Sequence, residues 1–581
     1  MKTKTMIFAW IILSAFSAVA QEKVESPTKS TEPATIIFDV NNISALFCIN
    51  EGVTSDEESG AHFFVPKNST KSTMYYSDFW IGGRDQNQQR KIASTLLRTF
   101  GSNFTPGPIF RYIADEPFDP DAWEEVETAQ DEKWNRFYIV EKKEIDDFLT
   151  SGGTQIANSI LEWPAHGDVS IDQPYHLAPF FDKNGDGVYN PHHGDHPLIR
   201  GDRAAFFIIN GTNHCHLDAD FGCFEVDIHG MIYGFDAPQD EVLNNTIFLN
   251  YKIVNRTGMD ITDTYLSLGT SFNIGLPSDD YIGCDVQRNA YFGYNASAVD
   301  GNGQAAAYGN NPPIQAVVIL GGPTINDERL GMTGFLSYTN DTGVTGYPST
   351  TFDFYNISKG IWRDNTRMRY GGGGHVNCGA NGPECDYMYP GLTDPDNIGT
   401  DGVDPNPLQY SADGWTEGGI GNAPGSRSGV GNVGPFTLLT DQTVELDFAY
   451  LTVFPKDSVT RFDQLGIFID SLTQSFLTGK TPYGQDYVTL NMPDNPKQPT
   501  PAEILLFPNP TSEIITIQLK DNNQQMGIIE LYNIFGMKIL TDNVSGNEHQ
   551  ISMKNLASGI YFCRIYSHTK QELGTYKIVK K

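Results

Sequence analysis

The segment that most constrains the fold is 444–454, because its apolar and polar residues alternate. Every second residue from Val444 to Tyr450 is apolar, and Glu445 and Asp447 stand between them. Successive side chains of a β-strand point to opposite faces of a sheet. The pattern therefore predicts a strand with one face on a core and the other in water.

Two other apolar, β-branched runs, 204–209 and 246–254, also predict strands. The 57 glycines and 33 prolines supply turn residues for many short strands. Helical spacing is rarer. It predicts a helix over 462–476 that stops at Gly479, and a second over 142–149. We expect a mainly β fold with a β-sandwich-like body and one or two helices.

The N-terminus has the features of a secretory signal peptide. Lys2 and Lys4 precede an apolar run that is too short to span a bilayer, and Ala18-Val19-Ala20 is a small-x-small cleavage pattern. Cleavage is expected after Ala20, and no transmembrane segment is expected in the mature chain. The expected segments are a signal peptide (1–20), a polar tether (21–35), a β-rich N-terminal body region with a calcium-type loop (36–237), a β-rich second body region (238–487), a proline-rich linker (488–502) and a C-terminal domain (503–581).

The C-terminal domain reads as a small β domain, in which Ile515, Ile517 and Leu519 alternate with polar residues. Its short blocks, from 507–510 to 577–580, resemble in order the type A C-terminal sorting domain of proteins exported by the type IX secretion system of Bacteroidota. The resemblance implies a small Ig-like β-sandwich, recognition by the outer-membrane translocon, and a secreted or cell-surface location. An ordinary β-sandwich interaction module is the alternative. The residues that match the blocks are Pro508, Asn509, Pro510, Gly536, Gly559, Tyr561, Lys577 and Lys580.

The body is similar to a large group of exported Bacteroidota proteins that carry the same type of C-terminal sorting domain. The similarity implies a shared fold and export route, and no particular chemistry. The matching blocks are 80–83, 106–108, 182–190 with 194–202, 279–285, 360–364 and 434–437.

The chain is strongly acidic, with a formal net charge of −32. Such a charge repels phosphate backbones and anionic lipids, so nucleic acid and membrane surfaces are not expected partners. An exported chain can form disulfides. Cys215 and Cys223 are close enough in sequence to close a small loop, as are Cys378 and Cys385. The distant Cys48, Cys284 and Cys563 cannot be paired from sequence.

One loop, 182–190, has the residue types of a calcium site. Side-chain oxygens stand at positions 1, 3, 5 and 9 of a calcium loop and glycine at position 6, where the turn is sharp. His193 takes position 12, and Asp195 is the nearest acid that could replace the usual glutamate there. Pro179 and Pro191 argue against flanking EF-hand helices. A turn without metal is the alternative. The expected ligands of a structural calcium are Asp182, Asn184, Asp186, the Val188 carbonyl, Asn190 and Asp195.

A second acidic cluster, Asp279, Asp280 and Asp285, is a further candidate calcium site, and a solvated loop is its alternative. The body contains no complete catalytic motif. We therefore expect a non-enzymatic binding or adhesion protein for a glycan, a matrix component or a surface protein. A secreted hydrolase of polysaccharide or protein, and a structural surface subunit, are the alternatives. Candidate stacking platforms are Trp80, Trp123, Trp134, Trp362 and Trp415.

Overall fold

A computed structural model describes most of the chain, which forms two compact units, Met1–Tyr487 (the body) and Val488–Lys581 (the C-terminal unit). The expected signal peptide, most of the tether and the linker lie outside the described residues. The structure describes residues 32–56, 60–95, 102–111, 120–213, 223–458, 460–481, 504–520, 525–533, 538–554, 556, 559–567 and 572–581.

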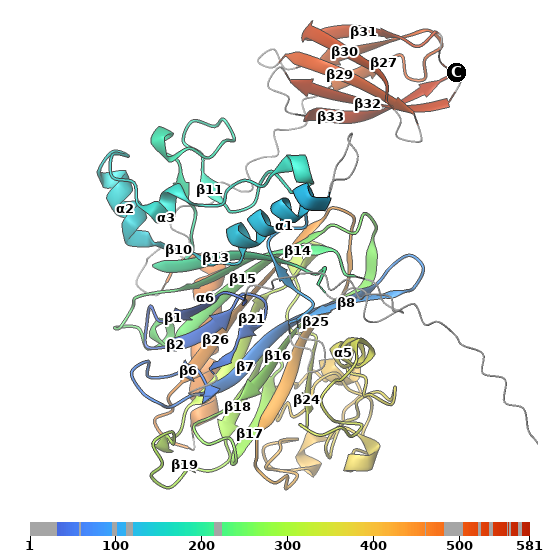
Figure 1. Cartoon of the computed structure of the whole chain (residues 1–581). Coiled ribbons are helices and arrows are strands. Elements are labelled where there is room, and N and C mark those ends of the chain that lie inside the picture. Colours follow the sequence, from blue (N-terminus) through green and yellow to red (C-terminus); the bar gives the residue numbers. More distant parts are fainter. Residues whose placement is uncertain are drawn as a thin grey trace, which may run out of the picture. The chain divides into compact units, whose positions relative to one another are not determined.

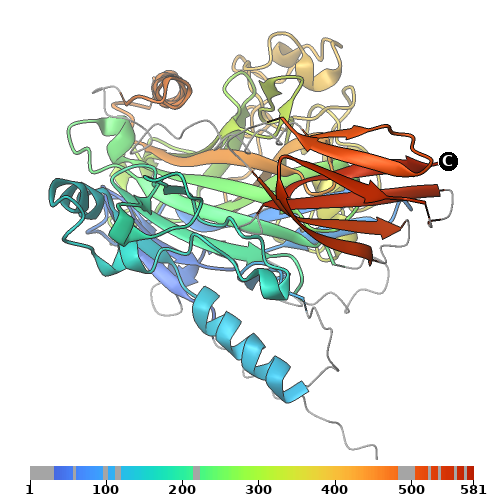
Figure 2. The same cartoon turned by 90° about the horizontal axis from the view of Figure 1, so that it is seen from above.

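The fold is mainly β, as expected, with 41% strand against 14% helix. The body holds two nine-stranded antiparallel sheets, visible as two layers in Figures 1 and 2. The first sheet runs β1 (Thr35–Phe38), β2 (Ser44–Cys48), β3 (Gly52–Val53), β7 (Met74–Arg84), β16 (Ile261–Phe272), β25 (Arg427–Leu438) and β24 (Gly334–Tyr338), with β6 (Phe63–Phe64) on β2 and β8 (Arg90–Ser94) on β7.

The second sheet contains all three strands that the sequence predicts most clearly, β13, β15 and β26. It runs β10 (Tyr138–Glu141), β13 (Arg203–Asn210), β14 (Val226–Gly234), β15 (Thr246–Asn255), β26 (Thr443–Val453), β21 (Ile314–Gly321), β18 (Ala290–Asn295) and β17 (Asp280–Asp285), with β9 (Thr105–Pro106) on β13. Four small ribbons are β4 (Ser55–Asp56) with β5 (Gly60–Ala61), β11 (Phe180–Phe181) with β12 (His196–Pro197), β19 (Val299–Asp300) with β20 (Gly309–Asn310), and β22 (Thr324–Ile325) with β23 (Glu328–Arg329).

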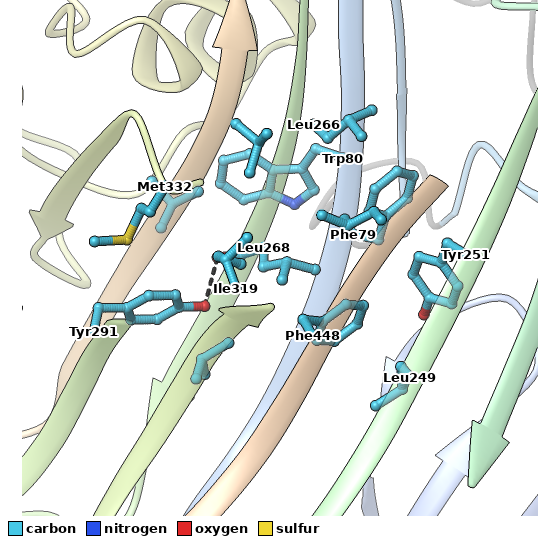
Figure 3. Packing of buried hydrophobic residues seen from close by; sticks show 14 of the residues in the cluster. Phe79, Trp80, Leu249, Tyr251, Leu266, Leu268, Tyr291, Ile319, Met332 and Phe448 are labelled. Carbon is cyan, nitrogen blue, oxygen red and sulfur yellow. Dashed lines mark hydrogen bonds between the residues drawn. The ribbon is translucent and has the colours of Figure 1, made fainter. Parts of the chain in front are cut away.

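The main core lies between the two sheets. Figure 3 shows Trp80 and Leu268 of the first sheet near Phe448 and Ile319 of the second. Tyr291 donates its hydroxyl to the Leu268 carbonyl oxygen at 2.7 Å, so its one polar atom is satisfied inside an apolar layer. This continuous packing fixes the sheet ends from which the loops of the body project.

A second core covers the outer face of the second sheet, where Leu465, Ile469 and Leu472 pack on strands such as β26. The expectation that one face of β26 meets water is therefore wrong. Asp447 is buried there and bonds Arg200 and Arg329, at 2.5 and 2.8 Å, which compensates its burial.

The expected helices are present as α2 (Lys142–Thr150) and α6 (Arg461–Thr478), and Gly479 ends α6 in a left-handed conformation. The sequence analysis does not predict the other helices. The sequence of α1, Pro120–Trp134, is rich in acidic residues and lacks a clear apolar stripe. The remaining helices are α3 (Asn158–Leu161), α4 (Glu241–Asn244) and α5 (Thr351–Ser358).

The expected boundary at residues 237–238 does not separate two compact units in the body. Strands from before and after it pair directly, as β14 with β15 and β7 with β16. Antiparallel pairing can place segments that are far apart in sequence side by side, so the two expected body regions share their sheets.

The C-terminal unit is built from two small sheets with a shared core that includes Ile515, Ile517 and Leu519. One sheet is β27 (Ile504–Phe507), β28 (Ile514–Leu519) and β31 (Glu548–Ser552). The other is β30 (Lys538–Gly546), β29 (Met526–Asn533), β32 (Gly559–Ser567) and β33 (Glu572–Lys580).

Candidate functional site

A cleft of about 660 Å³ opens where β7 and β25 begin and β16 ends. We call it the tyrosine cleft. Its walls come from segments that are far apart in sequence. The lining residues are Ala61, Phe64, Thr70, Ser72, Tyr75, Tyr76, Ser271, Phe272, Asn273, Gly275, Pro277, Ala306, Asn340 and Ser426.

A β-bulge places two tyrosines at the cleft. In the pairing of β7 with β16, Ser271 faces Tyr76 and Phe272 faces Met74, so Tyr75 is the extra residue. A bulge redirects side chains, and here consecutive residues both line the cleft. The rings of Tyr75 and Tyr76 meet edge to face, with centroids 6.3 Å apart and planes at 76°. Tyr75 is 44% exposed, so its ring is accessible to a ligand.

The polar groups of the cleft are neutral amides and hydroxyls. Neither the Asn273 amide nor the Tyr75 hydroxyl forms a side-chain hydrogen bond within the described part of the chain. Asn340 makes only a 3.5 Å contact with the Ser426 hydroxyl. Among the residues that the structure describes, the lining contains no Asp, Glu, His, Lys, Arg or Cys. The cleft therefore offers hydrogen-bond donors and acceptors without a formal charge.

Two buried carboxylates hold one wall of the cleft from behind. Asp280 accepts the Ile274 amide at 3.1 Å, and Asp300 accepts the Leu276 and Tyr308 amides at 3.3 and 2.5 Å. The segment between Asn273 and Pro277 is thereby fixed at two backbone positions. A Cβ on Gly275 would lie 2.0 Å from the Asp300 carboxylate, so this wall needs a glycine.

The second predicted calcium cluster is only partly assembled. Asp279 and Asp280 interact with Asp300, which the sequence analysis did not include, and each has one buried carboxylate oxygen without a hydrogen-bond partner. Burial, and then the neighbouring carboxylates, raise the pKa of Asp280 well above its usual value. Asp285 belongs elsewhere, because it lies at the other end of β17 and pairs with Arg288 at 3.1 Å.

The first predicted calcium loop is ordered by its own carboxylates. Asp182 accepts the amides of Gly185 and Gly187 at 2.8 and 2.7 Å. Asp195 is fully buried and accepts the amides of Lys183 and Asn190 at 2.9 and 2.8 Å, so it joins the start of the loop to its end.

Asp186 and Asn184 bond each other at 2.8 Å, and the Val188 amide bonds Asp186 at 2.8 Å. These bonds lower the pKa of Asp186, the backbone bond contributing most. The side-chain donors are oxygens, the type that calcium prefers, so the residues fit that ion. Within the described ranges, however, no three His, Cys, Asp or Glu side chains converge as a preformed metal site. Calcium therefore stays a prediction.

The candidate tryptophans whose side chains the structure describes do not form stacking platforms. Four of the five candidates are buried in the cores of the body, and the side chain of Trp123 lies outside what the structure describes. The buried residues are Trp80 (1% exposed), Trp134 (1%), Trp362 (0%) and Trp415 (0%). Large aromatic surfaces gain most by leaving water, which explains their burial.

The structure tests only one of the two expected cysteine pairs in full, Cys378 with Cys385. Cys223 is disulfide-bonded, and Cys215 lies outside the described residues. Cys378 and Cys385 are both free: Cys378 lies exposed in a 3-10 turn, and Cys385 is buried. Cys48, Cys284 and Cys563 are buried free thiols.

The first and last blocks of the expected sorting domain meet in the C-terminal unit. The Val579 amide donates to the Asn509 side-chain oxygen at 2.9 Å, and the amides of Thr511 and Lys581 continue the pairing. Gly536 lies outside the described residues. The other matched residues lie on β32 and β33, where Gly559 faces Lys580, Tyr561 faces Ile578 and Lys577 faces Phe562, or in the adjoining turn with Pro508 and Pro510.

The family model of the secretion system C-terminal sorting domain matches residues 505–581, which lie in this unit. The protein is a type IX secretion cargo. Its sorting domain places it outside the cell, secreted or attached to the surface, implies contact with the type IX translocon, and implies a Bacteroidota origin.

Other comparisons add little to what the sorting domain shows for this cargo protein. No curated protein matches the chain. A solved polysaccharide lyase is similar at 7% identity and a TM-score of 0.16, covering 70% of this chain and 37% of that chain. A similarity of that quality carries no argument about architecture or activity. No helix in the described ranges is long and apolar enough to cross a membrane.

Sequence reasoning missed the tyrosine cleft of this cargo protein entirely. Tyr75 and Tyr76 stand in the sequence as an ordinary strand dipeptide, and Asn273 as an ordinary loop residue. The pairing of β7 with β16 brings Tyr75 and Tyr76 beside Ser271 and Phe272, and the pairing of β16 with β25 brings Arg427, the neighbour of Ser426, opposite Phe272. The one local signal is the acidic run beginning at Asp279, which follows one cleft wall.

Proposed function

We propose that this type IX cargo is a non-enzymatic binding or adhesion protein that holds an extracellular ligand in the tyrosine cleft. The observation that carries the proposal is the cleft itself. It combines an exposed aromatic ring with neutral polar groups, the composition of a recognition site. The sorting domain delivers this site to the exterior, where the ligand is a glycan, a matrix component or a surface protein.

The composition of the cleft favours binding over hydrolysis. A glycosidase needs two carboxyl groups, roughly 5–10 Å apart, on either side of the scissile bond. The described lining of the tyrosine cleft has none. Asp280 and Asp300, next to the cleft wall, accept backbone amides and serve to hold it. Hydrolysis of polysaccharide or protein is therefore the less favoured function.

Calcium has a structural role in this proposal. Bound at the loop 182–190 with Asp195, the ion neutralises the Asp182 and Asp186 carboxylates and fixes the loop. The oxygen donors of the loop support this assignment. The affinity expected for an extracellular module of this kind is on the order of 10⁻⁴–10⁻³ M.

The proposal is tested with the purified exported protein. It is incubated with insoluble and soluble polysaccharides and with matrix proteins, with calcium at about 5 mM (roughly five to fifty times the expected dissociation constant) or with a chelator. Retention and the release of reducing ends or amines are measured in the same tubes. Retention without product supports a binding protein. Product formation, or no retention on any member of the panel, contradicts it.

A further inference from the structure

We propose that the ligand of the tyrosine cleft is an uncharged carbohydrate chain. The inference rests on the proposed binding function and names the chemical class that the cleft selects. It comes from the geometry and charge of the cleft, which distinguish a neutral glycan from an anionic one and from a protein.

The aromatic corner fits a sugar ring. A pyranose has an apolar face of C–H groups and a rim of hydroxyls. The 44% exposed ring of Tyr75 gives a flat apolar surface, and Tyr76 stands against it at 76°. A sugar whose apolar face lies on Tyr75 thus has a second aromatic surface beside it. The half-buried ring of Phe64 extends the apolar lining. Its centroid lies 4.5 Å from the centroid of the His62 ring.

The polar groups fit the hydroxyl rim. A side-chain amide has two donor hydrogens and an acceptor oxygen, and so it can bond two neighbouring hydroxyls of one sugar. The Asn273 amide makes no side-chain bond among the described residues, and the Asn340 amide makes only a long one. The Asn273 amide is therefore available to a ligand without breaking an internal side-chain hydrogen bond, and the Asn340 amide would give up only its long bond to Ser426, so little of the gain is offset.

The charge of the cleft excludes anionic polymers. Carboxylate and sulfate groups of acidic glycans are recognised by arginine and lysine, and neither is found in the lining that the structure describes. Lys71 lies between two lining residues, but its ammonium sits over the Tyr308 ring, 5.6 Å from the centroid. The net charge of −32 adds a general repulsion for polyanions.

The wall that carries Asn273 is pre-organised. The carboxylates of Asp280 and Asp300 hold the backbone at Ile274 and Leu276, and Thr70 bonds the Ala305 carbonyl at 3.2 Å across the same region. A rigid wall loses little conformational entropy when a ligand binds. Because a glycan of weakly interacting hydroxyls gains little per contact, this rigidity favours measurable affinity.

The experiment measures affinity by titration of the full exported protein. The neutral probes are a soluble β-glucan, xylan and mannan, the anionic probes are alginate and chondroitin sulfate, and the matrix proteins of the first test are titrated beside them. Tyr75→Ala and Asn273→Ala test the site, and Tyr75→Phe keeps the ring. Tyr175→Ala is the matched control, because Tyr175 is also an exposed tyrosine, at 39%, outside the cleft. Thermal unfolding confirms that each variant is folded.

We expect one or more neutral glycans to bind, and Tyr75→Ala and Asn273→Ala each to weaken that binding about tenfold. Tyr75→Phe and Tyr175→Ala should stay within about twofold of wild type. If a neutral glycan binds and neither Tyr75→Ala nor Asn273→Ala weakens that binding, the tyrosine cleft is not the binding site. Preferential binding of alginate or chondroitin sulfate, or of a matrix protein alone, overturns the ligand class and leaves the binding function intact. No binding to any polysaccharide or matrix protein overturns both.

Discussion

Replacing Asp78 with Asn should stabilise the body at neutral pH, although it removes a hydrogen-bonding acid from the core. Asp78 lies in β7 and is 3% exposed. One carboxylate oxygen accepts the Trp80 indole N–H at 2.7 Å. The other has no hydrogen-bond partner and faces Gly269, where a Cβ would lie 2.1 Å away. A carboxylate in this place is only half satisfied.

Burial raises the pKa of Asp78 to about 7, and the Trp80 bond opposes that rise only in part. The folded state therefore holds the proton more tightly than the unfolded state, which loses it near pH 4. Below pH 4 both states are protonated and no penalty exists. As the pH rises from 4 to 7, the folded state loses stability, and above pH 7 the penalty approaches about 4 kcal/mol.

Asparagine avoids this penalty because its amide does not ionise. Its oxygen can keep the Trp80 bond, but its NH₂ group takes the place of the unpaired oxygen and costs roughly 1–2 kcal/mol. The net gain for Asp78→Asn above pH 7 is then about 2–3 kcal/mol. At pH 4 the sign reverses, because only the cost of the unpaired NH₂ remains.

The assay is thermal unfolding of wild type and Asp78→Asn between pH 4 and pH 8. For a body of this size, 1 kcal/mol corresponds to about 1 °C, so the variant should gain about 2–3 °C at pH 8 and lose about 1–2 °C at pH 4. Asp441→Asn removes the same charge at an exposed position and should show no such dependence. A difference between Asp78→Asn and wild type that is constant across this pH range would refute the reasoning.

Four further predictions test other parts of the protein. Millimolar calcium should raise the unfolding temperature by about 1–2 °C, and Asp186→Ala should abolish the rise; an unchanged rise contradicts the loop assignment. A maleimide should label the exposed Cys378 of the native protein and spare Cys385, because Cys385 is buried and its burial raises the pKa of its thiol. Labelling of neither cysteine would indicate a disulfide between them. Deletion of residues 505–581 should leave the protein inside the cell envelope, as shown by fractionation. Sequencing of the exported protein should begin at Gln21, and a start at Met1 would contradict the signal peptide.

The strands could be predicted from sequence because their apolar residues follow a local period, as the confirmed β13, β15 and β26 show. Their surroundings could not. The alternation in β26 predicted a face in water, yet Asp447 is buried. Its partner Arg200 is 247 residues away in sequence, and no local pattern in either segment predicts that the two side chains pair. Sequence periodicity reports which residues share a face, and it does not report how many layers cover the sheet.

Tertiary packing also explains why the sequence predicted buried tryptophans as ligand-binding residues and did not predict the cleft. Tryptophan has the largest apolar surface, so in a protein with two extensive cores it is withdrawn from water, as Trp80 and Trp415 are. Tyrosine keeps a polar hydroxyl and can stay at the surface. Tyr75 reaches the cleft because a bulge adds one residue to β7 against β16, and a bulge is a property of two strands together. A sequence-based search for recognition sites in such sandwiches should therefore begin at aromatic residues near strand ends, where pairing is irregular, before it turns to the most hydrophobic aromatic residues.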